Sequence, residues 1–183
     1  MTNMEQVEKT YKNIIQMWNN AVANQDIKLD NCPYADNVEQ RILKDYDEKE
    51  FRKVHFTKPK QSNYYYYASN IGRIMLVPQG YPDKGVVPNE ECFVFPLKNF
   101  NIEDIEDGYL YLDEKKFQKN NPQFSEYTYR ESLSIHTFVA SAWLGKQEDD
   151  GLHVHHINNC GYDNRIINLV CLPAEIHDKI NKK

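Results

Sequence analysis

The sequence predicts an α+β fold with N-terminal helices, a small mixed β region and a C-terminal strand–loop–strand–helix unit. Three observations favour this order. Apolar residues first recur at the three-to-four spacing of a helix. Aromatic and β-branched residues then form short runs bounded by turn formers. Finally, residues 152–181 hold four of the six histidines on a pattern that changes from strand to helix.

The chain length and the composition indicate a globular protein that folds in water. A chain of 183 residues suits one domain with a modest core, with or without a small appendage. With 40% hydrophobic and 27% charged residues, it does not resemble a disordered chain. No run reaches the ~20 apolar residues of a membrane helix, and the start carries no signal-peptide pattern. We therefore expect a cytoplasmic protein without a membrane partner.

The cysteines indicate the cellular compartment, and the net charge bears on nucleic-acid binding. The four cysteines are scattered and form no C-x-x-C pair: Cys32, Cys92, Cys160 and Cys171. This pattern is typical of free thiols in a reducing compartment. The net charge of -5 argues mildly against nucleic-acid binding, because such proteins usually carry a basic face.

Residues 1–60 are predicted to form a helical region of unknown role. Residues 4–23 place apolar side chains on one helical stripe, which indicates a core-facing helix. Turn formers in "LDNCPYADN" interrupt the pattern. Residues 37–54 are richer in charge and favour a second helix with a weaker stripe.

Residues 61–145 are predicted to form an α+β module. "YYYYASNIGRIMLVP" indicates one or two strands with a turn at 70–72, and "ECFVFPL" and "GYLYLD" indicate further strands. "PQGYPDKGVVPNE" is rich in proline and glycine and predicts a long loop. "LSIHTFVASAWLG" predicts a helix that stops at Gly145, with His136 near its start as a partly buried, hydrogen-bonded histidine.

Residues 146–183 hold the side chains of greatest chemical interest. "LHVHHI" and "INLVCL" indicate strands around the loop "NNCGYDNRI", and "PAEIHDKINKK" indicates a helix with Pro173 in its first turn. His155, His156, Asn168 and His177 lie along this unit. His153 has no assigned role and is interpreted as an ordinary strand residue.

These residue types can perform hydrolytic chemistry. Two imidazoles from a strand and a helix can hold one divalent metal ion, and a third can act as a general base near neutral pH. An asparagine can pin a loop, because its amide both donates and accepts hydrogen bonds. Adjacent strand residues point to opposite faces, so His155 and His156 can share a site only where the strand ends or twists.

"VHHINNCGYDNRIINLVCLP" resembles the HNH endonucleases of the ββα-metal (His-Me finger) fold, in their phage and homing-type branch. The resemblance implies that His155 and His177 are metal ligands and that His156 is the general base. It also implies that Asn168 holds both the loop and the base, and that Asn164 closes the loop.

Two upstream segments extend the resemblance to about residues 62–180. "YYASNIGRI" is similar to the "YEVSNLGRV" module that often precedes HNH domains in phage proteins, with Ala68 in place of the usual valine. "LSIHTFVASAWLG" is similar to the family's "VHRLVAEAFLP" helix, with His136 at the histidine. Residues 1–60 carry no such likeness.

The resemblance implies a metal-dependent DNA endonuclease, either nicking or cutting both strands, in a bacterial host cell and encoded by a phage. One divalent ion is expected (Mg, Mn, Zn or Ni), and histidine at both ligand positions shifts the preference away from Mg. The candidate phosphate contacts are Arg73, Arg165, Lys179 and Lys182, although a single Lys or Arg is more often a solvated surface residue.

Two other functions fit the same residues. A phage-type binding protein could keep the nuclease fold with little or no activity and act on a host protein through residues 1–60. A toxin nuclease domain fits less well, because the sequence carries no secretion features. Asn181, one turn after His177, could be a further metal ligand or simply a residue of the helix surface.

Overall fold

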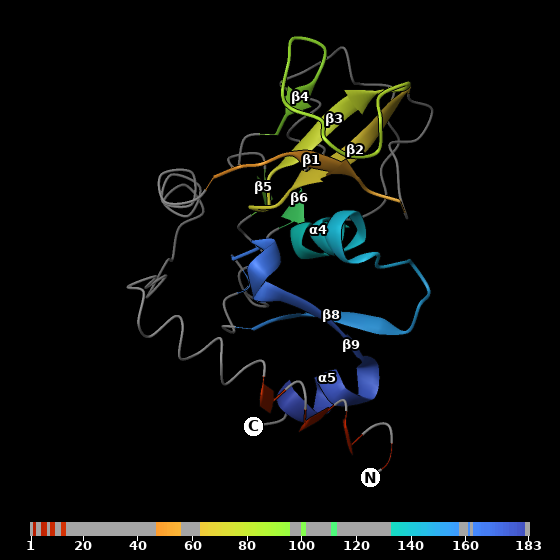
Figure 1. Cartoon of the computed structure of the whole chain (residues 1–183), viewed down its shortest axis with the longest axis vertical. Helices are drawn as coiled ribbons and strands as arrows, with labels where there is room; N and C mark the ends of the chain where they lie inside the picture. The colour runs from red at the N-terminus through yellow and green to blue at the C-terminus, as the bar shows by residue number, and fades with distance from the viewer. Residues whose placement is uncertain are drawn as a thin grey trace.

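The computed structural model shows a mixed α+β architecture, as the sequence predicts (Figure 1). It describes residues 47–55, 63–95, 100–101, 111–112, 133–157, 161 and 163–181, with several more between residues 2 and 13. Near the N-terminus the helical positions fall inside the predicted first helix: Glu5, Gln6, Glu8, Lys9, Lys12 and Asn13. Thr2 is described as well, and the other residues of the predicted helical region up to 46 lie outside the described ones.

The largest sheet has four antiparallel strands in the order β1-β2-β3-β4. These are β1 (Phe51–Lys53), β2 (Tyr64–Ser69), β3 (Ile74–Pro78) and β4 (Phe93–Val94). The turn between β2 and β3 falls at the predicted place, and Gly72 there has a φ of 91°. A positive φ favours glycine, because a Cβ atom would be strained in that conformation.

Strand β1 corrects the prediction of a helix through residue 54. Phe51 pairs with Ser69 on β2, and its N–H donates to the carbonyl of Val86 in the long proline-rich loop. Phe51 and Val54 are both buried. Sheet pairing and burial therefore outweigh the helical propensity of the charged residues that precede β1.

Three short strands and one helix complete the predicted module. β5 (Phe100–Asn101), β6 (Tyr111–Leu112) and β7 (Leu133–Ser134) form an antiparallel sheet. Helix α4 (Ile135–Leu144) ends at Gly145, which has a φ of 73° and donates its N–H to the carbonyl of Ala140. The predicted glycine stop is thereby confirmed.

The C-terminal unit has the predicted element order. β8 (Leu152–His156) pairs antiparallel with β9 (Leu169–Pro173), and the turn η4 (Ile166–Asn168) leads into β9. Helix α5 (Ala174–Asn181) follows at once, so Pro173 ends the strand rather than sitting in the helix. Leu172 and Ile176 pack together and fix α5 against the hairpin.

One hydrophobic core joins the two units that the sequence analysis separated at residue 145. Helix α4 lies between the four-stranded sheet and the β8–β9 hairpin (Figure 1). Its Phe138 and Val139 share a core with Tyr66 of β2, Val154 of β8 and Leu169 of β9. The hairpin therefore owes its position to α4. Within the described part of the chain, no helix is both long and apolar enough to cross a membrane.

Candidate metal and nuclease site

His155 and His177 face each other across the hairpin and α5. Alternation along β8 places His155 on the face that α5 covers. The two rings lie 5.6 Å apart between centroids at 80°, and His155 is only 5% exposed. The structure thus brings together the two histidines that the sequence analysis assigned to a metal ion.

The surroundings keep His155 neutral at pH 7. Burial, followed by the neighbouring His177 and His156, lowers the pKa of His155 to about 4. A neutral imidazole is the form that binds a metal ion, so no proton has to be displaced from this ring at neutral pH. The donor set therefore fits a borderline cation that accepts nitrogen ligands.

His156 lies on the other face of β8 and is also buried, at 4% exposure. Its Nε2 lies 2.9 Å from Oδ1 of Asn164. Because an amide oxygen only accepts, Nε2 carries the ring proton and donates it, which leaves Nδ1 as the basic nitrogen. Burial lowers the pKa of His156, while Asn164 and then Asp163 act to raise it.

A buried network shapes the loop that presents Asn164. Nε and Nη2 of Arg165 donate to the two carboxylate oxygens of Asp163, each at 2.6 Å. The side chain of Asn168 donates to the carbonyl of Asp163 at 2.8 Å, and the N–H of Ile157 donates to the carbonyl of Asn168 at 2.8 Å. The side chain of Asn168 therefore holds the loop, and the side chain of Asn164 contacts His156.

The turn between β2 and β3 supports this loop from outside. The N–H of Ile166 donates to the carbonyl of Asn70 at 2.9 Å. A Cβ atom on Gly72 would lie 2.8 Å from Cβ of Asn164, so the two segments pack without room for a side chain. The "SNIGR" segment and the histidine loop are thus one structural unit, which their separation in the sequence does not reveal.

His136 belongs to the same cluster of imidazoles. Its ring lies 5.1 Å from that of His156 at 82°, and its Nε2 lies 3.3 Å from Oγ of Ser134. Burial, then His156 and His177, lower the pKa of His136 to about 3. The predicted partly buried, hydrogen-bonded histidine is therefore confirmed, and it also contacts the candidate base.

The four predicted phosphate contacts have different environments. Arg165 is 1% exposed and engaged by Asp163, so its guanidinium supports the loop and does not face a phosphate; this corrects the predicted DNA contact. Arg73 pairs with Glu48 at 3.2 Å and keeps a quarter of its side chain exposed. Lys179 is exposed on α5, and Lys182 lies outside the described residues.

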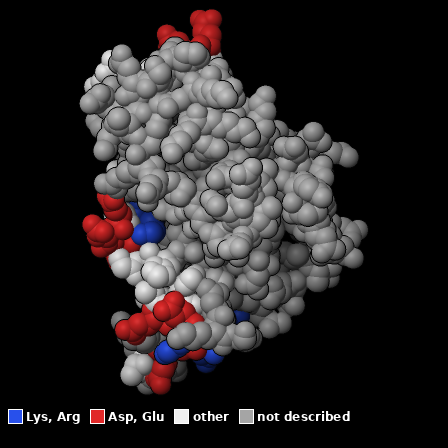
Figure 2. All heavy atoms as spheres, turned by 180° about the vertical axis from the view of Figure 1, so that it is seen from behind, with Lys and Arg blue, Asp and Glu red and all other residues white. Residues whose placement is uncertain are grey.

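The described charges do not gather into a basic patch on the face that Figure 2 shows. There the described Lys and Arg side chains lie next to Asp and Glu side chains. Lys179 has such a neighbour in Glu8, whose pKa is lowered mainly by Lys12 and to a lesser degree by Lys179. Any polyanion bound here would meet acids beside the cations.

His153 is the residue that the sequence analysis missed. It lies two positions before His155 on β8, on the same face, and its ring is 5.1 Å from that of His177. The available signal was the H-x-H spacing on a predicted strand, which places both imidazoles on one face.

Comparisons of this chain with family models, curated proteins and solved structures find no match. The site is therefore interpreted from its own geometry and from the sequence resemblance.

Proposed function

We propose that the chain is a metal-dependent DNA endonuclease of the HNH type, with a ββα-metal site, that nicks DNA or cuts both strands. The observation that carries the proposal is the arrangement of three histidines around one strand end. His155 faces His177 on one side of β8, while His156 is held by Asn164 on the other. One proposed metal ligand, His155, and the proposed base, His156, are thus adjacent residues of β8.

His155 and His177 would hold the single divalent ion. When bound, such an ion stabilises the negative charge that develops on the phosphate and on the leaving oxygen. Two imidazoles favour Mn²⁺, Ni²⁺ or Zn²⁺ over Mg²⁺, which prefers oxygen ligands. Two protein ligands also leave coordination positions for water and substrate.

His156 would take the proton from the attacking water at Nδ1. The hydrogen bond from Nε2 to Asn164 fixes the ring orientation and the tautomer before the reaction. After proton transfer the same hydrogen bond persists, and the nearby Asp163 carboxylate favours the positive ring. The water oxygen attacks phosphorus, the bond to the 3′ oxygen breaks, and that oxygen takes a proton from a second water molecule, giving 5′-phosphate and 3′-hydroxyl ends.

Arg73, Lys179 and Lys182 remain the proposed phosphate contacts. Arg73 pairs with Glu48, and Lys179 lies near Glu8, so these contacts would neutralise few phosphates. Each neutralised phosphate steepens the loss of affinity with rising salt. We therefore expect weak DNA binding with a shallow dependence on salt concentration.

A plasmid-nicking assay with Mn²⁺ or Mg²⁺, beside a chelator control, tests the activity. His156→Ala should abolish cleavage while metal and DNA binding remain. His55→Ala is the matched control, because it removes an exposed histidine that lies just after β1. Full cleavage by His156→Ala would refute the assignment of the base.

The second candidate is a nuclease-fold protein with little or no activity that binds a host protein through residues 1–60. The mixing of the described acidic and basic side chains in Figure 2 favours it, since DNA enzymes usually present a basic face. A folded chain that cleaves no DNA with Mg²⁺, Mn²⁺, Ni²⁺ or Zn²⁺ would support this candidate.

A further inference from the structure

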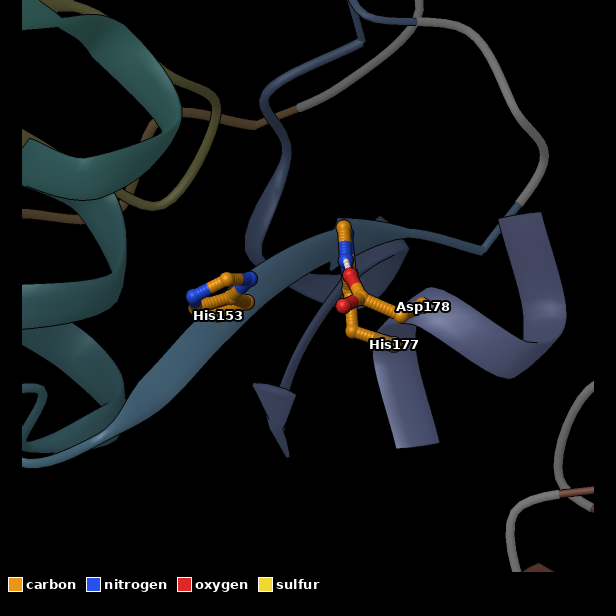
Figure 3. Close-up of side chains that lie close together, drawn as sticks. All are labelled: His153, His177 and Asp178. Atoms are coloured by element: carbon orange, nitrogen blue, oxygen red, sulfur yellow. Dashed lines mark ion pairs between the residues drawn. The ribbon is translucent and has the colours of Figure 1, made fainter. Parts of the chain in front are cut away.

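A cluster of three side chains that could hold a metal ion lies between β8 and α5, and the sequence analysis did not predict it. His153 projects from β8, and His177 and Asp178 project from α5 (Figure 3). One ligand atom from each of the three lies within 4.8 Å of the others. Nδ1 of His177 is 3.6 Å from Oδ1 of Asp178, so the carboxylate already faces the imidazole.

We propose that His153, His177 and Asp178 form a second site for a divalent transition-metal ion, the outer site. It shares His177 with the proposed metal-binding pair His155 and His177, the inner pair. Two imidazole nitrogens and one carboxylate oxygen are the ligand types of zinc sites that keep an open position. The chemical class is therefore a borderline cation such as Zn²⁺, with Co²⁺ as its spectroscopic substitute.

The site can close at little cost. Ligands of a tetrahedral zinc ion lie about 3.4 Å from one another, so atoms that now lie within 4.8 Å must approach by up to about 1.4 Å. His153 is exposed, and Asp178 keeps 61% of its side chain exposed, so both can rotate without disturbing a core. The backbones that carry them are fixed, because Leu172 and Ile176 hold α5 against the hairpin.

The shared ligand makes the two sites compete. His177 lies between them, with ring centroids 5.1 Å from His153 and 5.6 Å from His155. A metal-bound histidine gives one nitrogen to the ion and usually donates the other ring N–H to a neighbouring oxygen. An ion held by His153 and Asp178 would therefore take His177 from His155. Excess Zn²⁺ should then inhibit the Mn²⁺-supported reaction, a consequence that rests on the proposed function.

Calorimetric titration of the full, metal-stripped chain with Zn²⁺ tests the site without any activity. In a His155→Ala background, which removes the inner pair, the chain should still bind one Zn²⁺. Adding His153→Ala or Asp178→Asn to that background should weaken binding by about tenfold or more. His55→Ala in the same background should change nothing. Equal affinity with and without His153 would overturn the proposal.

NMR of the histidine rings in the wild-type chain tests the site without the His155→Ala variant. It therefore applies even if that variant does not fold. Sub-stoichiometric Zn²⁺ should shift the ring signals of His153 and His177 together. A His153 signal that stays fixed while His177 shifts would also overturn the site.

A nicking assay in Mn²⁺ with added Zn²⁺ then tests the competition. His153→Ala should need about tenfold more Zn²⁺ for the same inhibition. Inhibition unchanged by His153→Ala would refute the competition. If the chain cleaves no DNA at all, the proposed function fails, while the calorimetric and NMR results still decide whether the outer site exists.

Discussion

Replacing Gly72 by alanine should loosen the loop that holds His156, whereas the same replacement at Gly80 should not. Both glycines have a positive φ, 91° at Gly72 and 101° at Gly80. An L-residue there is strained by roughly 1–2 kcal/mol, and both alanines restrict the unfolded chain equally. The two variants therefore differ in what the new methyl group meets.

The packing around the two positions sets the magnitude. At Gly72 the added Cβ would lie 2.8 Å from Cβ and 3.1 Å from the carbonyl oxygen of Asn164. At Gly80 no described atom lies within 4 Å of it. Overpacking against a fixed backbone costs about 1–3 kcal/mol. Restriction of the unfolded chain offsets about 0.4–1 kcal/mol in both variants. We thus expect Gly80→Ala to lose about 0–1.5 kcal/mol of unfolding free energy and Gly72→Ala to lose about 1–3 kcal/mol more.

Urea unfolding followed by intrinsic fluorescence measures both values. Nicking rates then report whether Asn164 has moved away from His156, since Gly72→Ala should lower them and Gly80→Ala should not. Equal losses of stability in the two variants would refute the close contact between Gly72 and Asn164. A large stability loss at Gly72 with an unchanged nicking rate would refute the coupling of that contact to the base.

Three further predictions concern the buried polar groups. Arg165→Met should cost about 3–5 kcal/mol in urea unfolding, because it removes the guanidinium that neutralises the buried Asp163 carboxylate; a loss below 1 kcal/mol would contradict this. Asn164→Leu should lower the nicking rate by about 10²-fold or more, as the tautomer of His156 is no longer fixed; an unchanged rate would remove that role. In the metal-stripped chain, burial and neighbouring histidines lower the pKa of His136 to about 3 from 6.5, so between these values the unfolded chain binds a proton that the folded chain does not. The free energy of unfolding should therefore decrease as the pH is lowered below 6.5, by up to about 1.4 kcal/mol per pH unit from this group. In urea unfolding at several pH values, His136→Gln should make this dependence on pH less steep.

Local patterns were sufficient for the elements around the site. Gly145 ends α4 through a positive φ, which few other residues adopt. The end of the helix could therefore be predicted from the glycine that follows the helical pattern. The β8–β9 hairpin and α5 could be predicted in the same way, since their periodicity and turn residues are local. The facing of His155 and His177 followed from their order along those elements and from the family resemblance.

Long-range contacts decided what the patterns missed. Phe51–Lys53 reads as the end of a charged helix, but pairing with β2 and the contact with Val86 make it a strand. Arg165 reads as a surface cation, yet the loop folds its guanidinium onto Asp163 in the interior. Neither outcome is visible in sequence, because charge and propensity do not say which neighbour will be within reach.

The sequence by itself determined which side chains could do chemistry and on which elements they sit. The tertiary structure decided which side chains meet: Asn164 contacts His156, and His153 lies near His177 and Asp178. The physical reason is that periodicity fixes the face on which a side chain lies. Its partner is fixed only when α4 and the β2–β3 turn pack against the hairpin.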